Sequence, residues 1–172
     1  SGGTVKGDTT TGGLVGDSSG DIYDSHTSCT VAGRSHTGGF VGFSDGAVKN
    51  CYSIGGVSGT DYTGGFAGVI SRAENVISAG QVTIAGTPTQ GYNGGFAGKL
   101  YGMVAGLDNQ ITVKNVSANC MQPNGPDLPV VGNAIDFSGD AQKEALEKMA
   151  LRSNAEVNAA LKKLFPDPVK VM

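Results

Sequence analysis

A six-residue motif that recurs four times at nearly constant spacing constrains the fold of this chain more than any other feature. Each copy has Thr or Asn, two glycines, a larger apolar residue, a smaller apolar residue and a third glycine. The copies begin at residues 11, 37, 63 and 93, so their starts are separated by 26, 26 and 30 residues. A fixed period of about 20 to 50 residues is typical of solenoids, propellers and repeat arrays. The repeat is therefore the structural unit from which the fold is predicted.

Aligning the copies places like residues above like residues, as stacked coils require. Side chains in the clearest apolar column are expected to point inward, and those in the clearest polar column to hydrogen-bond from coil to coil. The polar column aligns once a single residue is deleted from the third copy. A further column, immediately before each motif, holds Thr10, His36, Tyr62 and Tyr92. The apolar column is Leu14, Phe40, Phe66 and Phe96, and the polar column is Asp24, Asn50, Asn75 and Asn115.

These columns predict an all-β fold, a β-solenoid of stacked coils of about 26 residues, with a C-terminal α-helical segment. Segments 47–52 and 81–84 are rich in β-branched or aromatic residues and are predicted strands. The glycines that bracket each apolar pair are expected at the bends, because glycine tolerates positive φ and close backbone approach. A leucine-rich repeat is rejected because the array lacks the leucine spacing that such repeats need.

The Gly-apolar-apolar-Gly core resembles the GLUG-motif repeat family. It is literal in Gly13-Leu14-Val15-Gly16, and the segment from Val48 to Gly59 is similar to that family's usual continuation. The resemblance covers roughly residues 4 to 120. It implies a modular region of a large bacterial surface or secreted protein, such as the non-catalytic part of some immunoglobulin-A-cleaving metallopeptidases. It implies no catalytic residue, and the HExxH zinc motif of those peptidases has no match here.

Three segments are expected along the chain. Residues 1–120 form the GLUG-like repeats and start in the middle of a coil, so the native protein is expected to continue upstream. Residues 121–138 form a linker or irregular crossover, because Pro and Gly cluster there. Residues 139–172 form a helical segment, which is either a cap on the last coil or the start of another domain. The exposed backbone edge of a final coil favours the cap.

Within the helical segment, two helices are expected. Asp140 is the predicted N-cap of the first, with Leu146, Met149 and Ala150 sharing one face. Ser153-Asn154-Ala155-Glu156 fits a capping box for the second helix. The apolar stripe of the second helix is Val157, Ala160, Leu161, Leu164 and Phe165.

Composition excludes several classes of protein. Charged residues make up 16% of the chain and the net charge is −3, with no basic stripe, so nucleic acid is not an expected partner. No stretch approaches the ~20 apolar residues of a membrane-spanning helix. The three cysteines contain no CxxC pair, which argues against a zinc or redox site. We expect three free thiols, with Cys51 a small buried hydrophobe and Cys29 too far along the strand to reach it.

Candidate chemical groups do not converge in the predicted coils. His26 and His36 occupy different columns, and a stacked aromatic position is expected for His36. Asp17, Asp21 and Asp24 cluster in the first coil, and calcium there is a minor alternative to solvated turn acids. The basic side chains scatter across columns instead of forming the shared patch of a β-helical polysaccharide lyase. They are Arg34, Lys49, Arg72, Lys99 and Lys114.

The sequence therefore predicts no catalytic, cofactor-binding or metal-binding residue, no cofactor and no enzymatic activity. The favoured function is a non-catalytic structural or adhesive repeat module of a bacterial extracellular surface protein. The alternatives are a ligand-binding face of an adhesin, for a host or cell-surface protein or a glycan, and less favourably a polysaccharide-active enzyme fragment. Flanking domains of the same polypeptide are further expected partners. Tyr23, Tyr52 and Tyr101 are candidate contacts wherever they are exposed, because Tyr often anchors recognition.

Overall fold

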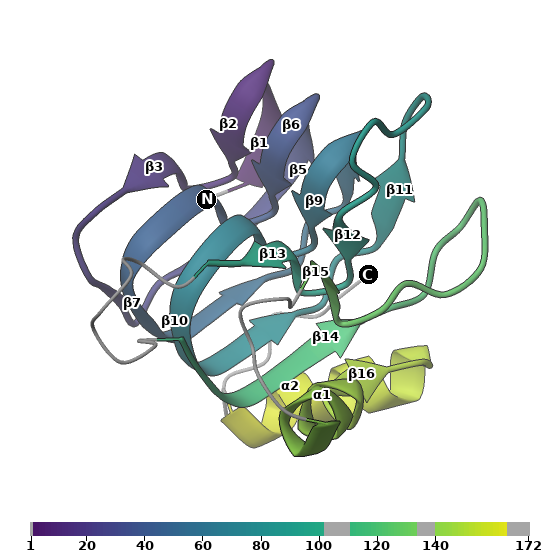
Figure 1. Cartoon of the computed structure of the whole chain (residues 1–172). Helices are drawn as coiled ribbons and strands as arrows, with labels where there is room; N and C mark the ends of the chain where they lie inside the picture. The colour runs from purple at the N-terminus through teal and green to yellow at the C-terminus, as the bar shows by residue number, and fades with distance from the viewer. Residues whose placement is uncertain (1, 102–110, 134–139, 165–172) are drawn as a thin grey trace.

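The chain folds into a β-solenoid in which the described strands pair in parallel, with two short helices toward the C-terminus (Figure 1). The computed structural model describes residues 2–101, 111–133 and 140–164. The all-β solenoid with a C-terminal helical segment, predicted from the motif spacing, is therefore confirmed.

The strands assemble into a 12-stranded sheet and a 4-stranded sheet. The smaller sheet consists of β2 (Thr9–Gly12), β6 (Ser35–Gly38), β9 (Asp61–Gly64) and β12 (Asn93–Gly94). The larger sheet consists of β1 (Gly2–Lys6), β3 (Val15–Ser18), β4 (Ile22–Tyr23), β5 (His26–Ala32), β7 (Val41–Ser53), β8 (Val57–Gly59), β10 (Ala67–Ser78), β11 (Val82–Ile84), β13 (Ala97–Leu100), β14 (Thr112–Asn119), β15 (Val131–Asn133) and β16 (Ala150–Leu151).

The register between coils follows the repeat. Val41 lies opposite Ala67, 26 residues later, and Ala67 lies opposite Ala97 in the next coil. Between β7 and β10 the register shifts by one residue, because Ile70 pairs with Ser44 whereas Arg72 pairs with Ala47. This irregularity is the single-residue deletion that the polar column required, so the alignment of that column is confirmed.

Three stacked phenylalanines form the centre of the core. Phe40, Phe66 and Phe96 are fully buried, and the Phe66 ring lies 4.6 Å from that of Phe40 and 5.7 Å from that of Phe96. The expectation that Leu14 is buried with them is wrong, because its side chain is 41% exposed. Leu14 occupies the first coil, and its backbone bonds only toward Phe40 in the described part of the chain. The buried part of this column is therefore Phe40, Phe66 and Phe96.

The motif glycines are needed for close packing. A Cβ on Gly38 would overlap backbone atoms of Val41 and Ala67, and one on Gly39 would overlap the carbonyl of Gly65 in the next coil. Neither glycine has a positive φ. The left-handed bends fall instead on non-glycine residues in two columns. They are Thr10, His36 and Tyr62 in one column and Asp24, Asn50, Asn75 and Asn115 in the other.

The polar column forms the predicted ladder. Asn50 donates its Nδ2–H to Asp24 Oδ1 at 2.9 Å, Asn75 donates to Asn50 Oδ1 at 3.0 Å, and Asn115 donates to Asn75 Oδ1 at 3.0 Å. Asn and Asp adopt left-handed backbone more readily than other non-glycine residues. The same residues therefore make the bend and link the coils.

The segment after residue 120 contains two short strands that the sequence did not predict. One lies within the expected linker, and the other lies between the two helices. Residues 131–133 form β15, which pairs with β13, and residues 150–151 form β16, which pairs with β14. Helix α1 (Asp140–Glu147) consequently ends before Met149, so the expected shared face of Leu146, Met149 and Ala150 does not form on one helix. The chain returns to the sheet because β16 supplies hydrogen-bond partners for the edge of β14.

Helix α2 (Asn154–Leu164) begins at the predicted cap. The Glu156 N–H donates to Ser153 Oγ at 3.3 Å, and the Glu156 carboxylate accepts from the Arg152 N–H at 2.7 Å. This second bond lies one residue before the position expected in a capping box. The hydrogen bond from the Arg152 N–H lowers the pKa of Glu156 most, and the hydrogen bond with the Ser153 side chain lowers it next.

The two helices cover different parts of the solenoid. Leu146 of α1 belongs to the main core cluster with Phe96 and Val116. Val157 and Leu161 of α2 instead join a second cluster, with Tyr52 and Ile77 on the flank of β7 and β10, and Figure 1 shows α2 alongside β14. The side chain of Leu164 and all of Phe165, which were assigned to this stripe, lie outside the described residues.

Candidate ligand-binding groove

Both histidines take part in ring stacks between coils. His26 stacks on Tyr52 with ring centroids 4.7 Å apart, and His36 stacks on Tyr62 at 4.6 Å. Tyr92 then meets Tyr62 edge-on at 5.2 Å, so the expected aromatic column is confirmed. Burial lowers the pKa of His36, and the positive charge of Lys99 lowers it further.

The first-coil aspartates are engaged within the protein. Asp21 accepts the Ala47 N–H at 2.7 Å and the Tyr23 hydroxyl at 2.9 Å, and the Ala47 bond is the largest cause that lowers its pKa. Asp24 accepts from Asn50 at the foot of the ladder. Asp17 is exposed in β3. In the described part of the chain, no three His, Cys, Asp or Glu side chains are grouped so that they could hold a metal ion.

Most of the five basic side chains that a polysaccharide lyase would gather into one patch have local partners in this structure. Arg34 forms a 2.7 Å ion pair with Asp8, and Lys49 forms one of 3.1 Å with Glu74 in the next coil. Arg72 donates to the Asp45 carbonyl, and the Lys99 ammonium lies 5.5 Å from the centre of the Tyr101 ring. Lys114 is exposed in β14. Lys49 and Lys114 are both paired in register with Glu74, from the two neighbouring strands. Lys49 and Arg72 line one shallow hollow. The structure therefore brings three of these five residues together, and the expected scatter is wrong for Lys49, Arg72 and Lys114.

No disulfide joins the three cysteines, and Cys51 is buried, as predicted. Cys29 and Cys120 are buried as well. Burial raises the pKa of the Cys51 thiol, and it raises the pKa of Cys120 to about 12. The Cys51 thiol donates to the carbonyl of Lys49 at 3.1 Å. A thiol held protonated in this way is a poor nucleophile.

The candidate tyrosines differ in exposure. Tyr23 is 49% exposed and Tyr101 is 36% exposed, whereas Tyr52 is only 8% exposed beneath α2. Tyr23 donates its hydroxyl to Asp21, and the Tyr101 ring contacts Phe43 at 6.1 Å. Tyr52 is therefore a packing residue, and the two exposed tyrosines lie apart in the first and last coils.

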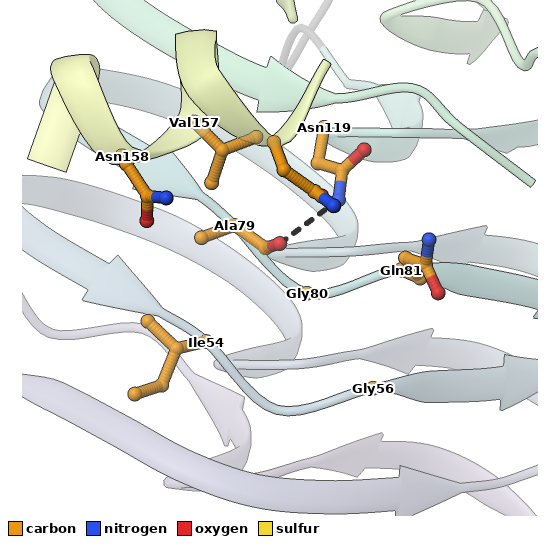
Figure 2. Close-up of a pocket in the computed structure, with 9 residues that line it drawn as sticks. Ile54, Gly56, Ala79, Gly80, Gln81, Asn119, Val157 and Asn158 are labelled. Carbon is orange, nitrogen blue, oxygen red and sulfur yellow. Dashed lines mark hydrogen bonds between the residues drawn. The ribbon is translucent and has the colours of Figure 1, made fainter. Parts of the chain in front are cut away.

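A groove of about 440 Å³ separates α2 from the flank of the solenoid (Figure 2). Its walls come from three coils and from the first turns of α2. In Figure 2, Val157 and Asn158 extend from the helix toward the strand ends that carry Ala79 and Ile54. The lining residues are Ile54, Gly56, Ala79, Gly80, Gln81, Asn119, Asn154, Val157 and Asn158.

Asn119 fixes the wall of this groove. Its Nδ2–H donates to the Ala79 carbonyl at 3.0 Å, as drawn in Figure 2, and its Oδ1 accepts the Met121 N–H at 3.1 Å. Both ends of this buried amide are thus used within the protein, as buried polar groups require. Asn119 shapes the groove and is not free to bind a ligand through those atoms.

The other three amides of the groove are available to a ligand. Gln81, Asn154 and Asn158 are exposed, and their side chains form no hydrogen bond with another described residue. Each amide can donate two hydrogen bonds and accept two. No charged side chain is among the described residues that line the groove. Its chemistry is therefore uncharged hydrogen bonding beside the half-buried side chain of Ile54.

The sequence did not reveal this groove. Gln81 lies far along the chain from Asn154 and Asn158, and only the packing of α2 brings them together. The one available signal was the capping box, because it placed Val157 on the inward stripe and thus Asn158 beside it.

No helix of the described residues is long and apolar enough to cross a membrane. Comparison with protein-family models, curated proteins and solved structures found no match to the chain.

Proposed function

We propose that this chain is a non-catalytic structural and adhesive repeat module of a bacterial extracellular surface protein. The observation that carries the proposal is the use of the repeated side chains to join coil to coil. The Asn column, the Phe column and the aromatic column each contact the same column in the next coil. Residues at equivalent positions of successive copies therefore hold the coils together, which is the task of a spacer or scaffold.

The ladders give such a module its stiffness. A solenoid is stabilised by contacts between nearest-neighbour coils, and each intramolecular hydrogen bond adds about 0.5–1.5 kcal/mol net. Burial of the Phe66 side chain adds about 1.5–3 kcal/mol. A stack linked at its core and on its exposed edge resists bending, which suits a segment that projects neighbouring domains of the same polypeptide from a surface.

The GLUG-like motif supports the extracellular setting. The ligand-binding alternative is favoured by one further observation, the uncharged groove beside α2. A polysaccharide-active enzyme fragment is not favoured, because Arg34 and Lys49 already pair with carboxylates and Arg72 with a backbone carbonyl.

Antibodies raised against the folded chain test the proposed setting. On the cells that produce the protein, they should label intact, non-permeabilised cells, or bind protein released into the medium. An antibody to a cytosolic protein controls for cell integrity. Labelling that requires permeabilisation would contradict the extracellular role.

A further inference from the structure

We propose that the groove between α2 and the solenoid flank binds a short uncharged glycan. This inference rests on the adhesive part of the proposed function and names its ligand class. The groove joins Ile54 and Gly56 after β7, Ala79 to Gln81 after β10, Asn119 at the end of β14, and the first turns of α2.

The size of the groove suits a small oligosaccharide. Its volume of about 440 Å³ lies within the range of about 300–1,000 Å³ that is usual for small-molecule sites. Three successive coils contribute to it, and coils repeat about every 4.8 Å. A ligand in contact with the first and third of these coils therefore spans roughly 10 Å. This is a site for a few linked rings, not for a long polymer lying along the whole solenoid.

The lining chemistry matches sugar hydroxyls. Gln81, Asn154 and Asn158 present amides that both donate and accept, and no protein partner among the described residues occupies them. A hydroxyl likewise donates and accepts, so each amide can bond one or two of them. Ile54 is half-buried and provides apolar surface for the C–H face of a sugar ring. An anionic or cationic ligand would find no opposite charge among the described lining residues.

An extended peptide is a poorer fit, because it would need unpaired backbone groups for strand addition. The carbonyls along the floor are already used. Gly56 accepts the Val31 N–H at 2.9 Å, Gln81 accepts the Val57 N–H at 2.9 Å, and Ala79 accepts the Asn119 side chain at 3.0 Å. A docked helix would need a row of apolar anchors, whereas most of this lining is amide and glycine. Recognition must therefore come from side-chain amides and the apolar surface of Ile54.

Of the two glycines that line the groove, Gly56 can be replaced by a larger residue to block a ligand. A Cβ on Gly56 would lie 3.8 Å from the Gln81 carbonyl, which is an ordinary contact, so Gly56→Ala is compatible with the fold. A Cβ on Gly80 would overlap the Gly55 carbonyl, so Gly80 is unsuitable. Gly56→Leu then projects a larger side chain from a position that has room at Cβ, and it should obstruct the groove.

The experiment is an NMR titration of the ¹⁵N-labelled chain with a panel of neutral di- and trisaccharides built from glucose, galactose, mannose and N-acetylglucosamine. Sialylated and sulfated sugars are titrated as charged ligands. A pool of short peptides is titrated as a third class of ligand. We expect at least one neutral sugar to shift the side-chain amide signals of Gln81, Asn154 and Asn158 together. Gln81→Ala and Asn158→Ala should each weaken its binding about five- to tenfold, as loss of a neutral hydrogen bond predicts. Gly56→Leu should abolish it.

Gln90→Ala, which removes an exposed amide outside the groove, is the matched control and should bind as the parent does. Unchanged melting temperatures show that the variants are folded. Shifts caused only by charged sugars or by peptides, shifts located elsewhere, or no shift up to about 10 mM sugar would each overturn the glycan site. Surface labelling of producing cells does not depend on any sugar, so failure of the titration is distinguishable from failure of the proposed function.

Discussion

The side-chain amide of Asn75 donates to Oδ1 of Asn50 at 3.0 Å, and both residues hold left-handed backbone with φ of 54° and 55°. The two properties belong together. A left-handed residue turns the chain at the same point in every coil, and this places successive side chains directly above one another. The direction of the ladder is constant, because each amide donates to the coil that precedes it. Asp24 ends the ladder, since a carboxylate accepts but cannot donate.

Replacing Asn75 separates the two roles of this position. Asn75→Ala removes both ladder bonds and replaces Asn by a residue that tolerates left-handed backbone poorly, at a strain of about 1–2 kcal/mol. Asn75→Gly removes the same bonds without that strain, so it should retain about 1 kcal/mol more stability than the alanine variant. Urea unfolding of both variants measures the difference. Equal stabilities, or a less stable glycine variant, would show that the backbone conformation contributes nothing.

The Phe column provides a matched pair of cavity variants. Phe66→Ala should lower the free energy of unfolding by about 3–5 kcal/mol, because it removes a fully buried ring between Phe40 and Phe96. Leu14→Ala truncates the exposed first position of the same column and should cost less than about 1 kcal/mol. Denaturant unfolding checks both values. A Leu14 variant as damaging as the Phe66 variant would contradict the exposed position of Leu14.

His36 should make the protein less stable under mild acid. Its pKa is lowered in the folded protein by burial and then by Lys99, so the unfolded chain binds the proton more readily. Stability is therefore full above the unfolded pKa of about 6.5 and falls as the pH decreases from there toward the folded pKa. His36→Tyr, which matches Tyr62 in the next coil, should remove this component. Urea unfolding at pH 8 and pH 5.5 measures the loss of stability in both proteins. If the variant loses as much stability between these pH values as the parent does, His36 is not the cause of the loss.

The thiols should resist labelling in the native state. Cys51 and Cys120 are buried and their pKa values are raised, by burial first, while Cys29 is buried in β5. A disulfide-exchange reagent at pH 8 should therefore react slowly with the folded protein and count three thiols promptly in denaturant. Peptide mapping assigns each label to its cysteine. Prompt native labelling of Cys51, or a Cys29–Cys51 disulfide by mass spectrometry, would contradict this packing.

The C-terminal segment should act as a cap. Removing residues 139–172 uncovers the edge of β14 and the part of the core contacted by Leu146, so we expect lower stability and self-association. Light scattering and thermal unfolding measure both effects. An unchanged melting temperature in a truncated protein that stays monomeric would instead indicate a separate domain.

Point variants in α1 and α2 test the cap while leaving strand β16 in place. Leu146→Ala and Leu161→Ala each truncate a buried side chain and should cost about 2–5 kcal/mol. Lys162→Ala changes a neighbouring exposed residue and should leave stability within about 0.5 kcal/mol. If the Leu161 variant matches the Lys162 control, α2 does not stabilise the solenoid.

The period, the columns and the single-residue deletion in the third copy were predictable from the sequence, because a solenoid imposes the same environment on equivalent residues in every coil. Only the strand register placed that deletion between Ile70 and Arg72. Asn above Asn and Phe above Phe are local consequences of that repetition. The capping box was equally visible, since it depends on residues within one turn of a helix.

The return of the chain as β15 and β16 and the groove beside α2 were decided only by tertiary structure. The groove depends on where a non-repeating helix comes to rest, which is set by the packing of Val157 and Leu161 against Tyr52 and Ile77. Contacts between segments so far apart in the chain produce no periodic pattern in the sequence. Asn154 and Asn158 lie outside the repeats, and they line a groove only because α2 packs on the flank of the solenoid.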